Sequence, residues 1–268
     1  MPDVSVLDEA IEMAEAEIPA NPNAPRNLRL ERSYARLMSN YFKGLEQAFP
    51  YDRLDSIYYK NVTMESFRES AVEDADEILD ALLRVFNARL LTSLNGEHIN
   101  IYLTGSAEMI TWGTTKAGIP IAYEGPPIRH AIDYAREHCA QLVTNLNDET
   151  KKRLAQVISK GIENKRGIDG LARDIRKEFT DMSRYRSQLI AKNETADALG
   201  QAFEDRGKEL GLTGKEWVTV GDDRVSEGCQ ENEAAGIIPF NQPFPSGHMR
   251  PPRFPGCRCA AAPAMLKE

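Results

Sequence analysis

The 268-residue sequence has few cysteines, few aromatic residues and no long hydrophobic run. Because no stretch reaches the roughly 20 apolar residues of a membrane-spanning helix, we expect no membrane partner. The first residues lack the basic start and apolar centre of a signal peptide, so a cytosolic origin is expected. Only four cysteines are present, and in a reducing compartment they predict metal binding or core packing rather than disulfides.

The sequence motifs of common enzymes are also missing. The sequence contains no glycine-rich phosphate loop, no His-Glu-x-x-His zinc motif and no Gly-x-Ser-x-Gly nucleophile elbow. We therefore expect a protein that is not an enzyme, with no catalytic and no cofactor-binding residue. A metal-dependent enzyme or a toxin-like domain is the least favoured alternative.

Charge is unevenly distributed along the chain. The net charge is −8 at pH 7, yet residues 150–215 contain 15 Lys and Arg against 10 Asp and Glu. Opposite charges are interspersed in that segment, which favours a solvated helical surface over a nucleic-acid site. A DNA-binding protein is kept as an alternative, and it would bind with a steep dependence on salt.

What the sequence does contain is the 3.6-residue apolar period of helices over most of its length. Asn95-Gly96 and the residues from Asn147 to Thr150 are interpreted as helix ends, and Gly211 as the signal that ends the last helix. These signals predict a mainly α fold with an extended helical N-terminal body. The predicted helices cover residues 4–18, 28–49, 63–94, 127–146, 150–164, 171–179 and 184–210.

The segment from Lys215 to Cys259 differs from the helical body, because it is rich in proline and glycine. Residues 217–220 and the proline-containing run 237–240 predict a short β-hairpin, with the second strand at an edge. No regular structure is expected from Pro243 to Pro255. We therefore predict a small C-terminal α+β module, partly irregular and rich in proline and cysteine.

The same segment holds candidate zinc ligands. Four donors, thiolates and imidazoles in a tetrahedral array, are what a structural zinc site needs. One residue separates Cys257 from Cys259, which is less than in most zinc motifs. Packing of the thiols beside Trp217, or a disulfide of Cys229, is therefore the alternative, and we expect either no cofactor or one zinc ion. The candidate ligands are Cys229, His248, Cys257 and Cys259.

Five further residues are assigned structural roles. Trp217 is expected in the core of the C-terminal module. Asp223 and Arg224 are expected to lock a tight turn through backbone and ion-pair bonds, so that Asp223→Ala would destabilise the module. Arg186 and Glu194 lie eight residues apart on one predicted helix and therefore on nearly the same face, which predicts an internal ion pair.

Seven blocks of the sequence follow one another in the order Ile158–Gly161, Leu171–Ile175, Arg186–Thr195, Trp217–Thr219, Asp223–Val225, Pro243–Gly247 and Pro255–Cys259. In this order and spacing they resemble the phage head morphogenesis proteins, also called Mu F-like minor head proteins. The N-terminal half resembles that family only in being helical. Two positions depart from the family pattern: Ser226 begins a stretch where many members have Cys-x-x-Cys or Cys-x-x-His, and Phe254 stands where many have histidine.

The resemblance implies a helical region over residues 1–147 and a Mu F-like head morphogenesis domain over residues 148–268. It further implies a minor capsid protein that binds the portal inside the head and assists head assembly and genome packaging or ejection. Expected partners are the portal protein, then scaffolding or major capsid protein and phage DNA. The expected location is the virion near the portal, after the host cytoplasm during assembly. A helix from Val4 to Ile18, within residues 1–25, is expected to be a portal-binding arm.

Overall fold

The computed structural model describes residues 18–62, 67–120 and 127–266. This part of the chain is mainly helical and has a small three-stranded antiparallel sheet near the C-terminus, which confirms the predicted fold class. The arm predicted from Val4 to Ile18 lies outside the described residues, apart from Ile18 itself.

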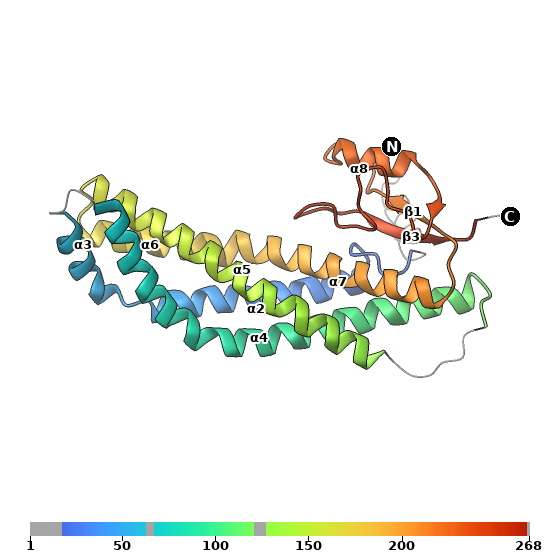
Figure 1. Cartoon of the computed structure of the whole chain (residues 1–268), viewed down its shortest axis with the longest axis horizontal. Helices are drawn as coiled ribbons and strands as arrows, with labels where there is room; N and C mark the ends of the chain where they lie inside the picture. The colour runs from blue at the N-terminus through green and yellow to red at the C-terminus, as the bar shows by residue number, and fades with distance from the viewer. Residues whose placement is uncertain (1–17, 63–66, 121–126, 267–268) are drawn as a thin grey trace, which may run out of the picture. The chain divides into compact units, whose positions relative to one another are not determined.

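Helices make up most of the chain before the sheet, as Figure 1 shows. A 3₁₀ turn (η1) precedes α3, and a π-helical turn (η2) joins α6 to α7 without a break. Within the described ranges, no helix combines the length and the apolar composition that crossing a membrane requires. The elements are α2 (Pro25–Ala48), η1 (Tyr51–Arg53), α3 (Leu54–Val62), α4 (Phe67–Thr115), α5 (Ile128–Glu163), α6 (Ile168–Asp181), η2 (Met182–Arg186) and α7 (Ser187–Glu209).

Two predicted helix ends lie inside continuous helices. Helix α4 passes through Asn95-Gly96 because Leu94 and His98, one turn apart, are both fully buried and continue its buried face. Their burial outweighs the cost of about 1 kcal/mol for a glycine in a helix. Helix α5 passes through Asn147 to Thr150, and the Thr150 hydroxyl donates to the carbonyl of Leu146, 2.6 Å away, from within the helix.

The chain divides into two compact units, and neither is continuous in sequence. The first unit comprises Met1–Ala35, Gly96–Tyr134 and Leu189–Glu268, and the second comprises Arg36–Asn95 and Ala135–Gln188. Helices α2, α4, α5 and α7 therefore each contribute residues to both units. The boundary expected between residues 147 and 148 falls within α5, and that division of the chain stays a prediction.

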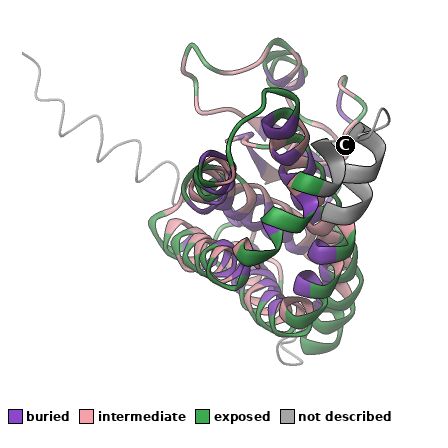
Figure 2. Ribbon diagram, turned by 90° about the vertical axis from the view of Figure 1, so that its left-hand side faces the viewer, coloured by how far each residue is buried: buried purple, intermediate pink, exposed green. Residues whose placement is uncertain are grey.

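The second unit has an aromatic and aliphatic core. The Phe49 ring lies 5.9 Å from the Phe179 ring of α6, in an edge-to-face arrangement. In Figure 2, buried positions alternate with exposed positions along the helices, as expected for amphipathic helices. Fully or almost fully buried members of this core include Met38, Phe42, Leu45, Leu54, Leu79, Leu83, Leu154, Ile158 and Ile175.

The first unit packs α7 closely against α4. A side chain at Gly105 would lie only 3.1 Å from Leu199 and from Ala202, so the small residue permits this approach. Polar bonds stabilise the same contact: the Tyr102 hydroxyl donates to Asp205 at 2.7 Å, and Nε of Arg206 donates to the Ser106 hydroxyl at 2.6 Å. This packing fixes α7 within the first unit, and the residues that follow α7 in turn contact this helix.

Gly211 ends α7 as the sequence predicts. It adopts a φ of 68°, in the left-handed region that favours glycine. Its N–H donates to Lys208 at 3.1 Å, and the N–H of Leu212 donates to Gly207 at 2.9 Å, which is the Schellman pattern. The chain is thereby turned directly into the first strand of the sheet.

The sheet has the order β2-β1-β3, with β1 (Gly214–Val218) in the centre and β2 (Ile238–Pro239) at the predicted edge. Helix α8 (Glu227–Ala234) and strand β3 (Ala260–Ala264) are not predicted by the sequence pattern. The pattern of α8 is weak because Cys229 is its one buried apolar residue. The pattern of β3 is weak because alanines have little intrinsic preference for a strand. Strand β3 forms because its backbone pairs with β1. We refer to residues 214–266 as the C-terminal module.

Arg250 fastens the irregular part of the C-terminal module to α7. Its guanidinium donates to Asp197 and to Gln201, both at 2.9 Å, and lies 3.4 Å from Glu204. Lys215 of β1 is almost fully buried and donates to the Met249 carbonyl at 2.7 Å, and burial lowers its pKa to about 8. The segment without regular structure is thus held by side chains, as its proline content requires.

Candidate metal centre

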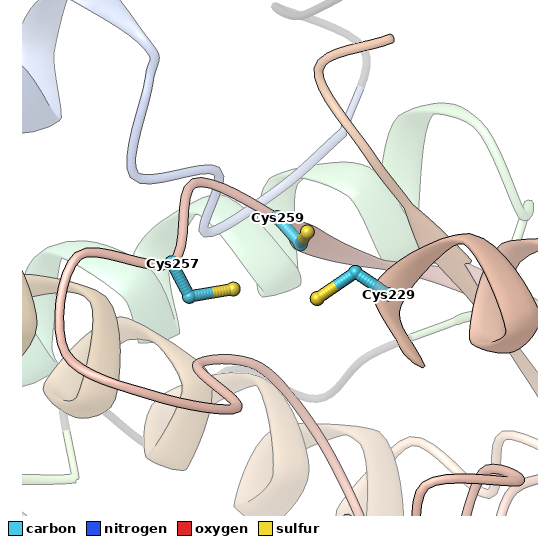
Figure 3. Close-up of side chains that lie close together, drawn as sticks. All are labelled: Cys229, Cys257 and Cys259. Atoms are coloured by element: carbon cyan, nitrogen blue, oxygen red, sulfur yellow. The ribbon is translucent and has the colours of Figure 1, made fainter. Parts of the chain in front are cut away.

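Three of the four candidate zinc ligands lie together. Cys229 is in the first turn of α8, whereas Cys257 and Cys259 immediately precede β3. All three are buried, and their sulfur atoms lie within 4.8 Å of one another. Figure 3 shows the side chains of Cys229 and Cys257 pointing toward each other, with Cys259 beside them. Cysteines distant in sequence therefore form one cluster, and none of them is in a disulfide.

The thiols lie in a small apolar core. Trp217 is fully buried in the same cluster, and its ring meets that of Phe244 edge to face, at 5.1 Å between centroids and an angle of 77°. The structure thus places Trp217 in the core of the module, where the sequence predicts it. The remaining members of this core are partly buried, namely Val225 and Ile238.

The three thiols differ in their affinity for a proton. A hydrogen bond from the Cys259 thiol lowers the pKa of Cys257 to about 5, and backbone N–H groups of Arg253 and Cys259 add to this effect. Donating to Cys257 raises the pKa of Cys259, as do its burial and the neighbouring negative charge. The cluster therefore favours at least one thiolate at neutral pH, and thiolate is the form of cysteine that binds metal.

His248 is not part of the cluster, contrary to the expected set of four ligands. Its Nδ1 lies 3.0 Å from the carbonyl oxygen and 3.1 Å from the hydroxyl of Ser246. Ser246 in turn bonds Asn232 of α8 through its backbone and its hydroxyl. The reason is a tight turn, in which the Phe244 N–H donates to the His248 carbonyl and ties the histidine back onto its own loop.

The turn that follows β1 is locked by Asp222 rather than by Asp223. Both terminal guanidinium nitrogens of Arg258 donate to the Asp222 carboxylate at 2.6 Å, and the backbone N–H of Arg224 donates to it at 3.1 Å. These bonds, those of Arg258 above all, hold the pKa of Asp222 well below its usual range. Asp223 is exposed, and the Arg224 side chain makes a looser contact with Asp222 at 3.3 Å.

Replacing Asp222 by asparagine is expected to lower the melting temperature of the module by a few degrees. The full decrease in melting temperature should be seen at neutral pH. A lowered carboxyl pKa stabilises the fold at pH values above the pKa of this group in the unfolded chain, which is near 3.8. The difference from wild type should vanish as the pH falls through the folded pKa. Asp223→Asn is the matched control and should leave the melting temperature unchanged. If Asp223→Asn lowered the melting temperature more than Asp222→Asn, then Asp223 and not Asp222 would stabilise the turn.

Arg186 and Glu194 have different partners from the ion pair that the sequence predicts. In the second unit, Arg186 donates to the hydroxyl of Thr150 at 3.0 Å and lies over the Phe42 ring, and burial lowers its pKa. In the first unit, Glu194 is buried, with a carboxylate oxygen 3.3 Å from Nε2 of His98. Helix packing and not mutual attraction therefore positions Arg186 and Glu194.

Sequence reasoning did not single out Arg250 or Arg258, although both hold the module together. The sequence signal for such a role is a basic residue within a proline-rich segment that is expected to have no regular structure. A charge there needs a carboxylate or carbonyl partner from another element, and the structure supplies Asp197 and Asp222.

Residues 148–262 match the model of the family described as Phage Mu protein F like protein. They run from the second half of α5 to β3 and include every member of the cysteine cluster. A match to this family suggests a phage head-related protein with a location in the virion. Residues 148–262 are therefore similar to the Mu F-like family of phage head morphogenesis proteins. The comparisons with curated proteins and with solved structures found no match.

Proposed function

We propose that this protein is a minor head protein that binds the portal inside the capsid and assists head assembly and genome packaging or ejection. The family match over residues 148–262 is the observation that carries this proposal. In this role the protein acts by binding and has no enzymatic activity. Scaffolding protein and major capsid protein are its further partners during assembly.

The charges of the structure favour protein binding over DNA binding. Residues 150–215 have an excess of positive charge, but five of their 15 basic side chains are paired with carboxylates of the same unit. A paired cation releases fewer counterions from a phosphate backbone, so such a surface has little electrostatic attraction for DNA. The pairs are Lys151–Asp80, Arg153–Glu178, Arg166–Asp174, Arg206–Glu209 and Lys208–Glu204.

The test is co-expression of the full chain with the portal protein, purification through a tag on the portal, and stoichiometry by native mass spectrometry. A stable complex with a defined number of copies per portal ring is expected. The complex should survive raised salt, because exposed charges contribute little to it. If the chain does not co-purify, portal binding is refuted; if it instead retains DNA with steep salt dependence, the DNA-binding alternative replaces it.

The portal-binding arm is tested with variants of its sequence. Placing charge at two apolar positions, Leu7→Glu with Ile11→Glu, should weaken the portal complex at least tenfold, because helix-in-groove binding depends on apolar anchors. Glu9→Lys with Glu15→Lys, at polar positions of the same segment, is the control and should bind within about threefold of wild type. Equal binding by both pairs would move the portal contact to the rest of the chain.

A further inference from the structure

The cysteine cluster has the geometry of a metal site with three protein ligands. In a tetrahedral site with Zn–S bonds of about 2.3 Å, the sulfur atoms lie roughly 3.8 Å apart. The sulfur atoms of Cys229, Cys257 and Cys259 already lie within 4.8 Å of one another, so small side-chain rotations would bring them to a common ion. Three soft thiolate donors favour zinc over magnesium or calcium, which prefer oxygen.

The one-residue spacing of Cys257 and Cys259 suits this geometry. In an extended chain, residues i and i+2 point to one face and the residue between them points to the other. Between the two cysteines, the Arg258 side chain is held by Asp222, and the Arg258 carbonyl accepts a hydrogen bond of 2.8 Å from the Asn23 side chain. The loop is therefore fixed from outside, which holds both thiols in place before any ion binds.

Two buried donors around the cluster lack acceptors. The indole N–H of Trp217 has no hydrogen-bond partner of normal geometry among the described residues, although it lies close to the Cys259 sulfur. Nε of Arg253 is likewise buried and without a partner in the described part of the chain. Unpaired buried donors are costly, and metal-bound thiolates would give this neighbourhood the negative charge that both donors require.

A cavity of about 40 Å³ adjoins the thiols, and its lining includes all three cysteines together with Ser226 and Arg258. A water molecule occupies roughly 30 Å³ in the liquid, so the cavity has room for one. His248 is held in its own turn by Ser246, so the fourth coordination position faces this cavity instead of an imidazole.

We propose that Cys229, Cys257 and Cys259 bind one zinc ion as thiolates, and that a solvent molecule in the adjoining cavity completes its coordination. The ion links α8 to the loop before β3, and binding releases the protons of the thiols that are not already ionised. Because a site of this kind forms only in the folded module, metal binding stabilises the fold. The inference is independent of portal binding.

The test uses the full chain, purified under reducing conditions. We expect about one zinc ion per chain by elemental analysis, and three sulfur ligands with one oxygen ligand by X-ray absorption. Removing the ion with a chelator should lower the melting temperature and leave all three thiols reactive after unfolding. Zinc well below about half an equivalent, even after reconstitution, would show that the thiols only pack a core.

Variants separate this ligand set from the one with four protein ligands. Cys257→Ser should lose most of the bound zinc, and His248→Gln, the control outside the cluster, should keep it. Loss of zinc in His248→Gln, or an imidazole nitrogen in the wild-type absorption spectrum, would refute a solvent ligand. The spectrum needs no variant, so the ligand set is decided even if Cys257→Ser does not fold.

Discussion

Replacing Trp217 by alanine is expected to destabilise the C-terminal module by about 3–5 kcal/mol. Trp217 is fully buried in the central strand and contacts the aromatic ring of Phe244 as well as the cysteine cluster. Trp217 is paired with Ala261 of β3, and β2 pairs with the start of the same strand, so the backbone has little freedom to close the cavity that alanine would leave. The loss is therefore expected at the high end for a core residue.

Hydrogen exchange measured on peptides from β1 is the appropriate readout, because it reports local opening of the module separately from the helices. Faster exchange in Trp217→Ala should appear in β1 and β3, with little change in α4. Ile237→Ala is the control: its side chain is half exposed in the same module, and the expected loss is below about 1 kcal/mol. Equal effects of the two variants would show that Trp217 is not the centre of this core.

The helices could be predicted from sequence because the apolar period of each reflects the face that it buries. Their ends could not always be predicted, since Asn95-Gly96 and the Asn147–Thr150 stretch carry local signals for ending a helix. Burial of neighbouring residues such as Leu94 and Leu146 overrides those signals. Gly211 did end α7, because the following residues must leave the helix to form β1. Local signals are decisive only where tertiary contacts do not oppose them.

The candidate metal centre was only partly predictable for a related reason. Residue type identified Cys229, Cys257 and Cys259, because few side chains bind zinc. Residue type also suggested His248, but a turn of only a few residues directs that histidine to Ser246. Hydrogen bonding within a loop is decided by geometry that spacing along the sequence does not contain. The same holds for the choice between adjacent aspartates after β1, where the position of Arg258 decides.

Replacing Gly200 by alanine is expected to destabilise the protein by about 1–3 kcal/mol, although alanine is the better helix former. Gly200 lies in α7, and a Cβ atom there would be 2.6 Å from the carbonyl oxygen of Pro251 and 2.8 Å from the Arg250 guanidinium. The carbonyl belongs to the backbone and cannot rotate away. The irregular segment would have to move off α7 and strain the bonds of Arg250 to Asp197 and Gln201.

Gly96→Ala is the matched control, because it makes the same change inside α4 at an exposed position with no atom within 4 Å. It should stabilise the protein by about 0.5–1 kcal/mol, so the two variants are expected to shift urea unfolding in opposite directions. A double-mutant cycle of Gly200→Ala with Arg250→Ala should be non-additive, since removing the guanidinium relieves one of the two clashes. Additive effects, or stabilisation by Gly200→Ala, would mean that the irregular segment does not rest on α7 in solution.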